Sequence, residues 1–178
     1  MKIKKLYELI LFLSLFNTSL LAQVYVAPQL EFVCELKVTC DTGMTLGPTA
    51  HGLRLMVPIT GGTFEGPKLK GVVLIGGADY QYSDRERGRT EIEAIYTIKT
   101  DDNVLIHIRN VGLSYIPADL RDLMKKGEKF DPDKIYFRAA PKFEAPNDSK
   151  YDWMNNAIFV CKGVPTKEYV SIQVWKVL

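Results

Sequence analysis

The clearest pattern in the chain is an alternation of apolar and polar positions near its beginning. The apolar positions are Leu30, Phe32, Cys34, Leu36 and Val38, and mostly polar residues stand between them. A period of two is typical of a half-buried strand, because successive side chains point to opposite faces of a sheet. The pattern therefore predicts a β-strand with one face turned toward a core.

Eight further segments have the length and composition of strands: 53–59, 69–75, 78–83, 90–100, 104–110, 135–140, 157–161 and 169–177. Turn-forming residues separate several of them, namely Gly61-Gly62, Gly76-Gly77, the Asp-Asp-Asn run at 101–103 and the Gly-Val-Pro run at 163–165. Many short strands with turns between them predict an all-β, mainly antiparallel fold, either a sandwich or a barrel.

One internal segment is predicted to be helical. Pro117 suits a first turn, Leu120, Leu123 and Met124 share one face, and Gly127 provides a stop. A single short helix among many strands is expected to act as a plug or lid. No repeat or internal linker interrupts the pattern, so residues 23–178 are predicted to form one domain.

The N-terminus has the pattern of a signal peptide. Three lysines within the first five residues precede the apolar stretch 9–16, and Ala22 offers a cleavage position. The apolar stretch is short for a bilayer span, although an uncleaved membrane anchor is the alternative. We therefore expect residues 1–22 to be removed and the protein to be exported to the periplasm or exterior of a bacterium, without stable membrane insertion.

Charge changes when the predicted signal peptide is set aside. The whole chain has a formal net charge of +2, whereas residues 23–178 contain 20 basic and 20 acidic residues. The basic residues are scattered rather than arranged in a stripe. The sequence therefore predicts no nucleic-acid partner.

The three cysteines allow two interpretations. In an oxidising compartment Cys34, Cys40 and Cys161 could supply one disulfide, in any of three pairings, and one free thiol. Alternatively, all three are small buried apolar side chains, since free cysteine is among the most buried residue types.

Motifs for metal or cofactor binding are missing from the sequence. His51 and His107 are far apart and lack the spacing of transition-metal ligands. The chain has no Gly-x-Ser-x-Gly elbow, Walker loop or dinucleotide fingerprint. We therefore predict no metal and no cofactor.

Five blocks carry a resemblance to a known family: GPTAHG at 47–52, PITGGTFEGP at 58–67, GVVLIGGAD at 71–79, YFRAAPKFE at 136–144 and YDWMN at 151–155. With these blocks the chain resembles the uncharacterised domain-of-unknown-function family 3237, from about Leu30 to Leu178. The resemblance implies a small closed β-barrel of about eight to nine strands, similar in shape to lipocalin-type calycins. The chain departs from the family pattern at Tyr80, where Trp is usual, and at Ile95, where many members carry Arg.

A barrel of this size has room inside for side chains or one small ligand, and inward polar residues are costly unless they are bonded or meet a guest. Tyr136 and Arg138 share one face of their strand, and His107 and Arg109 share one face of theirs. Either pair could point inward, and the pattern does not decide which face does.

Three residues are candidates for catalysis. Asp79, after two glycines, could act as a general base, or it caps a turn. His51 has a suitable pKa for proton transfer, although a solvated loop histidine is the alternative. Arg138 could hold a carbonyl or anionic oxygen with its planar fork, or it pairs with Glu144 or Asp79.

Six further residues are candidates for ligand contacts: Tyr136, Arg109, Asn110, Tyr96, Trp153 and Asn155. Trp153 and Asn155 would offer a stacking surface and an orienting amide. For Trp153 the alternative is a core or barrel-end position, and the tyrosines share that ambiguity.

Two functions follow from these candidates. The first is a cofactor-independent lyase, isomerase or hydratase that acts on a small carbonyl, phenolic or sugar-like compound. The second is a binding protein that encloses a small molecule without altering it. A barrel filled by its own side chains is a third outcome. The predicted partner is a small-molecule ligand, and a homo-oligomer is compatible with the sequence.

Overall fold

The computed structural model describes residues 25–178, so the predicted signal peptide over residues 1–22 lies outside the described residues. The strands are β1 (Leu30–Cys40), β2 (Met44–Thr49), β3 (Gly52–Glu65), β4 (Lys70–Val73), β5 (Ala78–Asp84), β6 (Arg89–Thr100), β7 (Leu105–Tyr115), β8 (Tyr136–Glu144), β9 (Phe159–Pro165) and β10 (Val170–Val177). The helices are α2 (Ala118–Lys126) and the short 3-10 helices η2 (Pro132–Lys134) and η3 (Asp152–Asn156).

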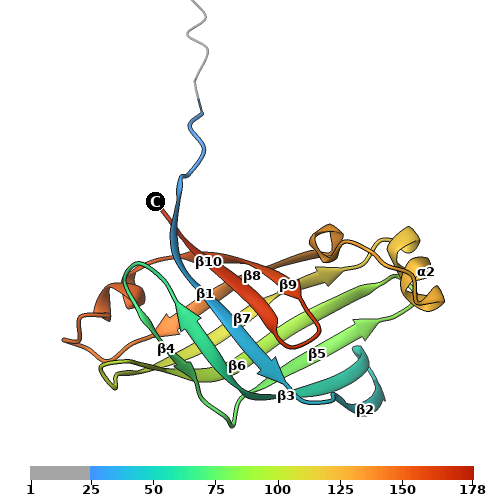
Figure 1. Cartoon of the computed structure of the whole chain (residues 1–178), viewed down its shortest axis with the longest axis horizontal. Coiled ribbons are helices and arrows are strands. Elements are labelled where there is room, and N and C mark those ends of the chain that lie inside the picture. Colours follow the sequence, from blue (N-terminus) through green and yellow to red (C-terminus); the bar gives the residue numbers. More distant parts are fainter. Residues whose placement is uncertain (1–24) are drawn as a thin grey trace, which may run out of the picture.

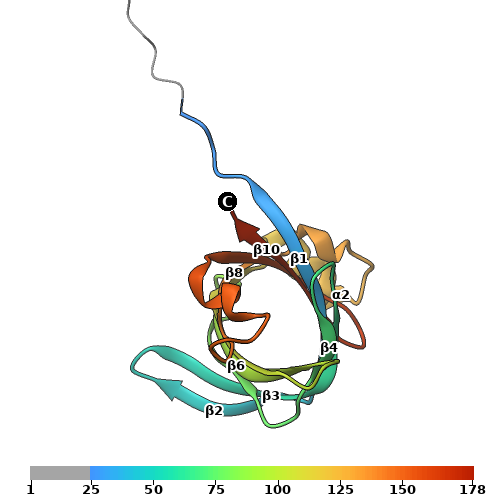
Figure 2. The same cartoon turned by 90° about the vertical axis from the view of Figure 1, so that its left-hand side faces the viewer.

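Eight of these strands close an antiparallel barrel (Figures 1 and 2). Around the wall they follow the order β1, β10, β9, β8, β7, β6, β5 and β3, and the pairing of β1 with β3 closes the ring. Two strands are additional: β4 also bridges β3 and β6, and β2 pairs with β3 outside the ring. The predicted all-β barrel with one short α-helix is confirmed.

Alternation along the strands places the core inside the barrel. In β8 every second residue from Phe137 to Phe143 is buried, and the residues between them are exposed. The same alternation runs along β6 from Ile92 to Ile98. Side chains such as Phe143 and Phe159 are fully buried, and each large apolar side chain buried in this way contributes about 1.5–3 kcal/mol to folding.

The segment that contains η3 lies at one end of the barrel (Figure 2), and its side chains pack there against those of β8 and β9. Phe159 packs edge-on against Phe143, with ring centroids 4.9 Å apart, and lies 5.9 Å from the Trp153 ring. Tyr151 is buried beside them, and its hydroxyl donates a 2.7 Å hydrogen bond to Asp102 Oδ1. This end therefore offers no entry for a guest.

The helix α2 lies at the opposite end and is fastened there by Arg121. The guanidinium donates to the carbonyl oxygens of Ile116 (2.7 Å), Arg87 (3.1 Å) and Glu86 (3.2 Å). Gly88 makes room for it, because a Cβ at that position would lie 2.2 Å from Arg121 Nη1. The helix is thus held against the turn between β5 and β6, beside the barrel rather than inside it.

Two predicted turns are wrong, because glycines there serve close packing instead. β3 continues through Gly61 and Gly62, whose φ values are 138° and 137°. A Cβ on Gly62 would lie 2.1 Å from the carbonyl oxygen of Lys37, so only glycine lets β1 approach β3 and close the barrel. Gly163 lies within β9, with the Phe137 ring packed against it.

The cysteines form no disulfide in the described part of the chain. Cys34 and Cys161 point into the barrel from β1 and β9, and Val174 on β10 lies between them in register. Two strand spacings separate their Cα atoms by roughly 10 Å, beyond the roughly 7 Å that a disulfide can bridge. Cys40 is exposed at the end of β1, so only two of the three fit the interpretation of buried apolar side chains.

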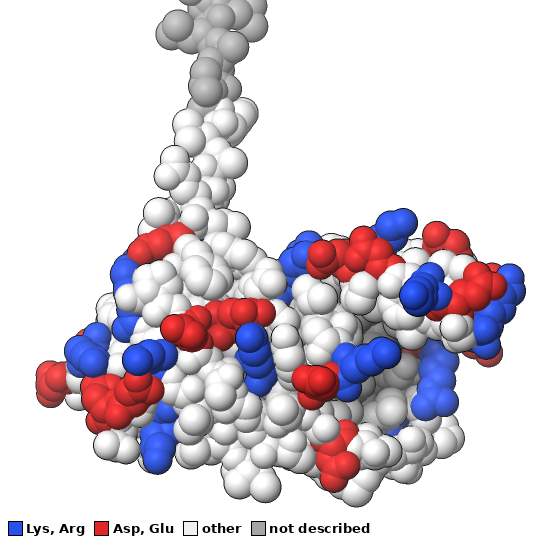
Figure 3. Space-filling model, in the orientation of Figure 1, with Lys and Arg blue, Asp and Glu red and all other residues white. Residues whose placement is uncertain are grey.

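Charge on the outside is mixed in sign. Figure 3 shows basic and acidic side chains interspersed over one face, with a recess below the segment that contains α2. None of the helices in residues 25–178 has the length and apolar character of a membrane span.

Candidate functional site

A cavity of about 260 Å³ occupies the barrel interior near the α2 end. It is lined by Val38, Cys40, Val57, Ile59, Asp79, Gln81, Thr90, Ile92, Ala94, Tyr96, Asn110, Ser114, Phe137, Pro165, Val170 and Ile172. Several of these residues stand at strand ends, including Cys40 at the end of β1, Pro165 at the end of β9 and Val170 at the start of β10. The cavity therefore opens where these strands terminate, opposite the end filled by η3.

Three polar side chains surround one small residue in this cavity. Asp79 on β5 pairs with Ala94 on β6, and Ala94 pairs in turn with Asn110 on β7. Tyr96 is the next inward residue along β6 after Ala94. Because alanine lies between the longer side chains, space remains between the carboxyl of Asp79 and the amide of Asn110, whose Cα atoms stand roughly 10 Å apart.

The carboxyl of Asp79 is held by two donors. The Gln81 amide donates to Oδ2 at 2.6 Å, and the backbone N–H of Glu93 donates to Oδ1 at 3.1 Å. Burial raises the pKa of Asp79 above its ordinary value of 3.8, while these two hydrogen bonds oppose the rise. No lysine, arginine or histidine lines the cavity to neutralise the carboxylate.

Asp79 also interrupts the backbone ladder of the barrel wall. β5 and β6 pair at Asp79 with Ala94 and again at Tyr82 with Glu91, but no pairing is formed between these two points. In this gap the Glu93 N–H bonds to the Asp79 side chain instead of a neighbouring carbonyl. The Asp79 carboxyl thus takes the place of a backbone acceptor in this part of the wall.

Tyr96 on β6 and Asn110 on β7 provide neutral hydrogen-bonding groups on the two strands next to Asp79. Burial raises the pKa of the Tyr96 phenol, so it stays a protonated donor at neutral pH. Asn110 is only 2% exposed, and its amide exchanges 3.7 Å hydrogen bonds with the thiol of Cys161. These contacts link the amide on β7 to the thiol on β9.

The remaining polar residues of the cavity were not among the predicted site residues: Cys40, Gln81, Thr90 and Ser114. The Thr90 hydroxyl lies 3.3 Å from that of Ser83. Partial desolvation by the cavity wall, and secondly the charge of Asp79, raise the pKa of Cys40 although the residue is exposed at the end of β1, so its thiol is a weak nucleophile at neutral pH. Gln81 could have been predicted as a neighbour of Asp79, because residues two apart on a strand point to the same face of the sheet.

The structure does not bring the three predicted catalytic residues together. Asp79 lies in the cavity, whereas His51 is exposed in the β2–β3 hairpin, with its ring 5.7 Å from that of Tyr82. Arg138 is exposed on the outer wall and stacks near Tyr136, 5.4 Å from the ring centroid. Arg138, one of the candidates for the hollow, therefore lies outside it, because β8 turns the side chains of Phe137 and Ala139 inward.

The predicted ligand residues divide in the same way. Tyr96 and Asn110 line the cavity, but Arg109 is outside, paired with Glu93 at 2.7 Å. Trp153 packs at the closed end, which was the alternative for this residue.

Asn155 closes the loop around η3. Its amide oxygen accepts from the Ala145 N–H, and its amide nitrogen donates to the Ala145 carbonyl and to Asp152 Oδ1. No group of three potential metal ligands is found in residues 25–178.

Comparison with known proteins places the chain in a family. The model described as "protein of unknown function (DUF3237)" matches residues 28–177, so the chain belongs to this family. A UPF0311 protein of Rhodopseudomonas palustris is 35% identical over 85% of this chain and 99% of its own length. A UPF0311 protein of Clostridium acetobutylicum is 36% identical over 83% and 92%.

Solved structures share the fold. The conserved protein of unknown function from R. palustris superposes with a TM-score of 0.78, at 32% identity over 86% of this chain and all of that one. A "beta-barrel like protein" of Acinetobacter baumannii gives 0.75, at 32% identity over 88% and 99%. A protein described as an enzyme from Penicillium herquei gives 0.64 at 22% identity over 89% and 100%, which shows a common fold alone.

Proposed function

We propose that this protein is an enzyme that moves a proton on a small uncharged carbonyl or phenolic compound held inside the barrel. The reaction class is that of lyases, isomerases and hydratases that need no cofactor. The observation that carries the proposal is a half-buried carboxyl, Asp79, with a raised pKa, that lines the same cavity as the neutral donors Tyr96 and Asn110 on the next two strands. Clustered perturbed groups of this kind are typical of catalytic sites.

Asp79 is the general base of the proposed reaction. A carboxylate whose pKa is raised by burial is a stronger base than one in water, and its protonated form can return the proton later. Gln81 and the Glu93 N–H hold its two oxygens and so fix its direction. In the first step the carboxylate takes a proton from the carbon next to the substrate carbonyl.

The electron pair released from that C–H bond moves to the carbonyl oxygen and creates an enolate-like charge. The Tyr96 hydroxyl and the Asn110 amide are the donors that would meet this oxygen, in place of the Arg138 guanidinium expected from the sequence. Fixed donors in a water-poor site stabilise such a charge, and one such donor is typically worth about 2.7–4 kcal/mol of barrier. Asp79 then delivers its proton to another substrate atom and regains its charge.

Size and charge limit the substrate. A volume of about 260 Å³ lies just below the range of about 300–1,000 Å³ for drug-sized ligands, so the substrate is a single ring or a short branched chain. The walls are largely apolar, and the one ionisable acid with no cation beside it disfavours anions. A protein of the same fold that is described as an enzyme agrees with catalysis on this fold.

A binding protein without catalysis is the second candidate, and one observation favours it. Both oxygens of Asp79 already accept hydrogen bonds, as expected of a carboxyl that joins β5 to β6. In that case the cavity would enclose its guest through Tyr96, Phe137 and the aliphatic walls. We also propose, from the N-terminal sequence pattern, that the protein acts outside the cytoplasm.

Hydrogen–deuterium exchange tests the proposal without knowledge of the natural substrate. Small cyclic ketones are incubated with the protein in D₂O, and NMR follows the loss of protons next to the carbonyl. We expect exchange above the buffer rate for the wild type and loss of that excess in Asp79→Asn. Asp101→Asn, the same change at an exposed carboxyl paired with Lys70, serves as the matched control and keeps full exchange.

Two results would decide otherwise. Equal exchange in the wild type and Asp79→Asn would refute a catalytic role for the carboxyl. Saturable chemical-shift changes at cavity residues, unchanged in Asp79→Asn and without any exchange, would establish the binding protein instead.

A further inference from the structure

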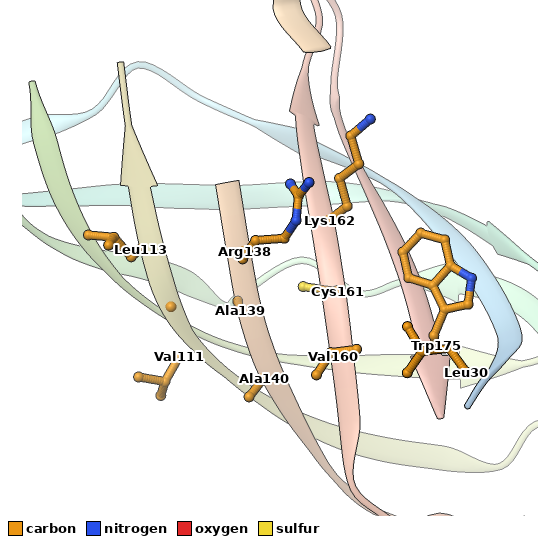
Figure 4. Close-up of a pocket in the computed structure, with 11 residues that line it drawn as sticks. Leu30, Val111, Leu113, Arg138, Ala139, Ala140, Val160, Cys161, Lys162 and Trp175 are labelled. Atoms are coloured by element: carbon orange, nitrogen blue, oxygen red, sulfur yellow. The ribbon is translucent and has the colours of Figure 1, made fainter. Parts of the chain in front are cut away.

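A second hollow lies on the outside of the barrel, across β7, β8, β9, β10 and β1 (Figure 4). It is an open groove of about 560 Å³, which we name the outer groove. Its side chains are those of Leu30, Val111, Leu113, Arg138, Ala140, Val160, Lys162 and Trp175. The outer groove is larger than the interior cavity and shares no side chain with it.

The floor of the outer groove is apolar. Val111 pairs with Ala140, Val160 pairs with Trp175, and Trp175 pairs with Phe32 on the next strand, with the two rings 5.9 Å apart. Val111 is 42% exposed, and Leu30, at the edge of the groove, is 54% exposed. Contiguous apolar side chains over several strands mark a binding surface, in contrast to single exposed hydrophobic residues.

Two cations stand together at one end of this floor. Arg138 and Lys162 face each other directly on β8 and β9, and Figure 4 shows both extending toward the same end of the groove. Like charges directly opposite each other destabilise a sheet. Lys162 is paired with Asp133 at 2.6 Å. Arg138 has no ion-pair partner among residues 25–178 and only donates to the carbonyl of Phe137, at 2.9 Å.

The distance from the cations to Trp175 follows from the register. Arg138 on β8 pairs with Lys162 on β9, and Lys162 pairs with Gln173 on β10. Trp175 is two residues further along β10. Two strand spacings in one direction and two residue rises in the other separate the Cα atoms of Arg138 and Trp175 by roughly 12 Å. An extended hydrocarbon of about ten carbons covers that distance at roughly 1.3 Å per carbon.

We propose that the outer groove binds an amphipathic carboxylate with a chain of about ten carbons, such as a free medium-chain fatty acid. The carboxylate bonds to Arg138 and Lys162, the chain lies over Ala140 and Val160, and its end contacts Trp175. A guanidinium gives a carboxylate bidentate, charge-assisted hydrogen bonds. This inference concerns the outer wall and does not depend on the function proposed for the interior cavity.

A second copy of the chain fits the outer groove less well. Self-association would need a free carboxylate opposite Arg138. The carboxylates that border this face are already paired, Glu93 with Arg109 and Glu144 with Lys142. A fatty acid brings its own carboxylate and therefore supplies the charge that the face lacks.

Fluorescence of Trp175 provides the test. The chain has two tryptophans, so Trp153→Phe leaves Trp175 as the only indole. Titration of this full-length variant with decanoate should give a saturable change in emission, and decanol should bind about two- to fivefold more weakly, as expected for an exposed ion pair. The difference should shrink in high salt, because exposed charges are screened.

Two further variants connect the signal to the cation. Arg138→Gln should weaken decanoate about two- to fivefold while leaving decanol unchanged. Arg109→Gln, an exposed arginine of the same face that already has a carboxylate partner, should change neither. Equal affinity for decanoate and decanol in the Trp153→Phe protein would overturn the proposal, and this result does not depend on the Arg138 variant. A concentration-dependent dimer that Trp175→Lys dissociates would overturn it in favour of a second copy.

Discussion

Replacement of Ala94 by leucine tests the hollow at its centre. Ala94 lies between Asp79 and Asn110 and borders the space in which we place the substrate. Leucine adds three carbon atoms, which are worth at most about 2.4 kcal/mol if fully buried, at about 0.8 kcal/mol per carbon. Ordering the side chain costs about 0.5–1 kcal/mol. We therefore expect the free energy of unfolding to rise by about 1 kcal/mol.

Ala139→Leu is the matched control, because Ala139 is also buried and points inward but does not line the interior cavity. A Cβ on the neighbouring Gly112 would lie only 2.3 Å from the Ala139 Cβ. Overpacking of this kind costs about 1–3 kcal/mol. The two identical substitutions should therefore change stability in opposite directions.

Urea unfolding followed by tryptophan fluorescence measures both variants, with linear extrapolation of the free energy of unfolding. Ala94→Leu should also abolish the exchange of ketone protons, since the added side chain fills the site. Destabilisation of Ala94→Leu as large as that of Ala139→Leu would refute the reasoning. Full exchange activity in a well-folded Ala94→Leu would do so as well.

Three further predictions concern pH, thiols and the closure of the barrel. Because burial raises the folded pKa of Asp79 above 3.8, the native state holds this proton more tightly than the unfolded chain does. The contribution of Asp79 to stability is thus greatest below pH 3.8 and is lost as the pH rises through the folded pKa, so the stability of the wild type relative to Asp79→Asn should fall over that interval in urea titrations. N-ethylmaleimide at pH 8 should label only the exposed Cys40 in the native protein, because burial raises the pKa of Cys34 to about 12 and of Cys161 to about 11. Mass spectrometry measures the labelling, and a buried thiol that is labelled before Cys40 would contradict the prediction. Gly62→Ala should destabilise the protein by more than about 3 kcal/mol in thermal or urea unfolding, since its Cβ would collide with the β1 backbone, and a small effect would mean that β1 and β3 can separate locally.

Much of the fold could be predicted from periodicity, and the failures have identifiable causes. The alternation over residues 30–38 corresponds to β1, and the predicted helix corresponds to α2. β2 was missed because Gly47 and Pro48 disguise an outer strand that needs only one partner. Gly61 and Gly62 of β3 have the sequence of a turn, and only their contact with β1, a strand distant in sequence, shows why glycine is needed there.

The site was partly predictable for a related reason. In β8 the residues Phe137, Ala139 and Phe143 share one parity, so that parity faces the core and Arg138 must face outward. A polar residue on the same face of a strand as buried apolar residues is the better indicator of a residue that lines the cavity. Asn110, in step with Ile106 and Ile108, satisfies that criterion and lines the cavity.

The location of Asp79 could be predicted only as a glycine-adjacent carboxyl, because its environment is made by distant segments. The backbone N–H of Glu93 and the rung through Ala94 to Asn110 come from strands that the chain brings beside β5 only on folding. No local spacing encodes these partners.

The gap in pairing between β5 and β6 links guest capture to the integrity of the wall. Asp79 Oδ1 is the acceptor for the Glu93 amide, so a guest that draws this oxygen away leaves a main-chain donor unsatisfied. Such a guest would speed amide hydrogen exchange at Glu93 while it protects the cavity floor. A guest that bonds to Oδ2 alone would displace only the flexible Gln81 side chain. The backbone hydrogen bond to Oδ1 therefore favours the binding of a guest at Oδ2.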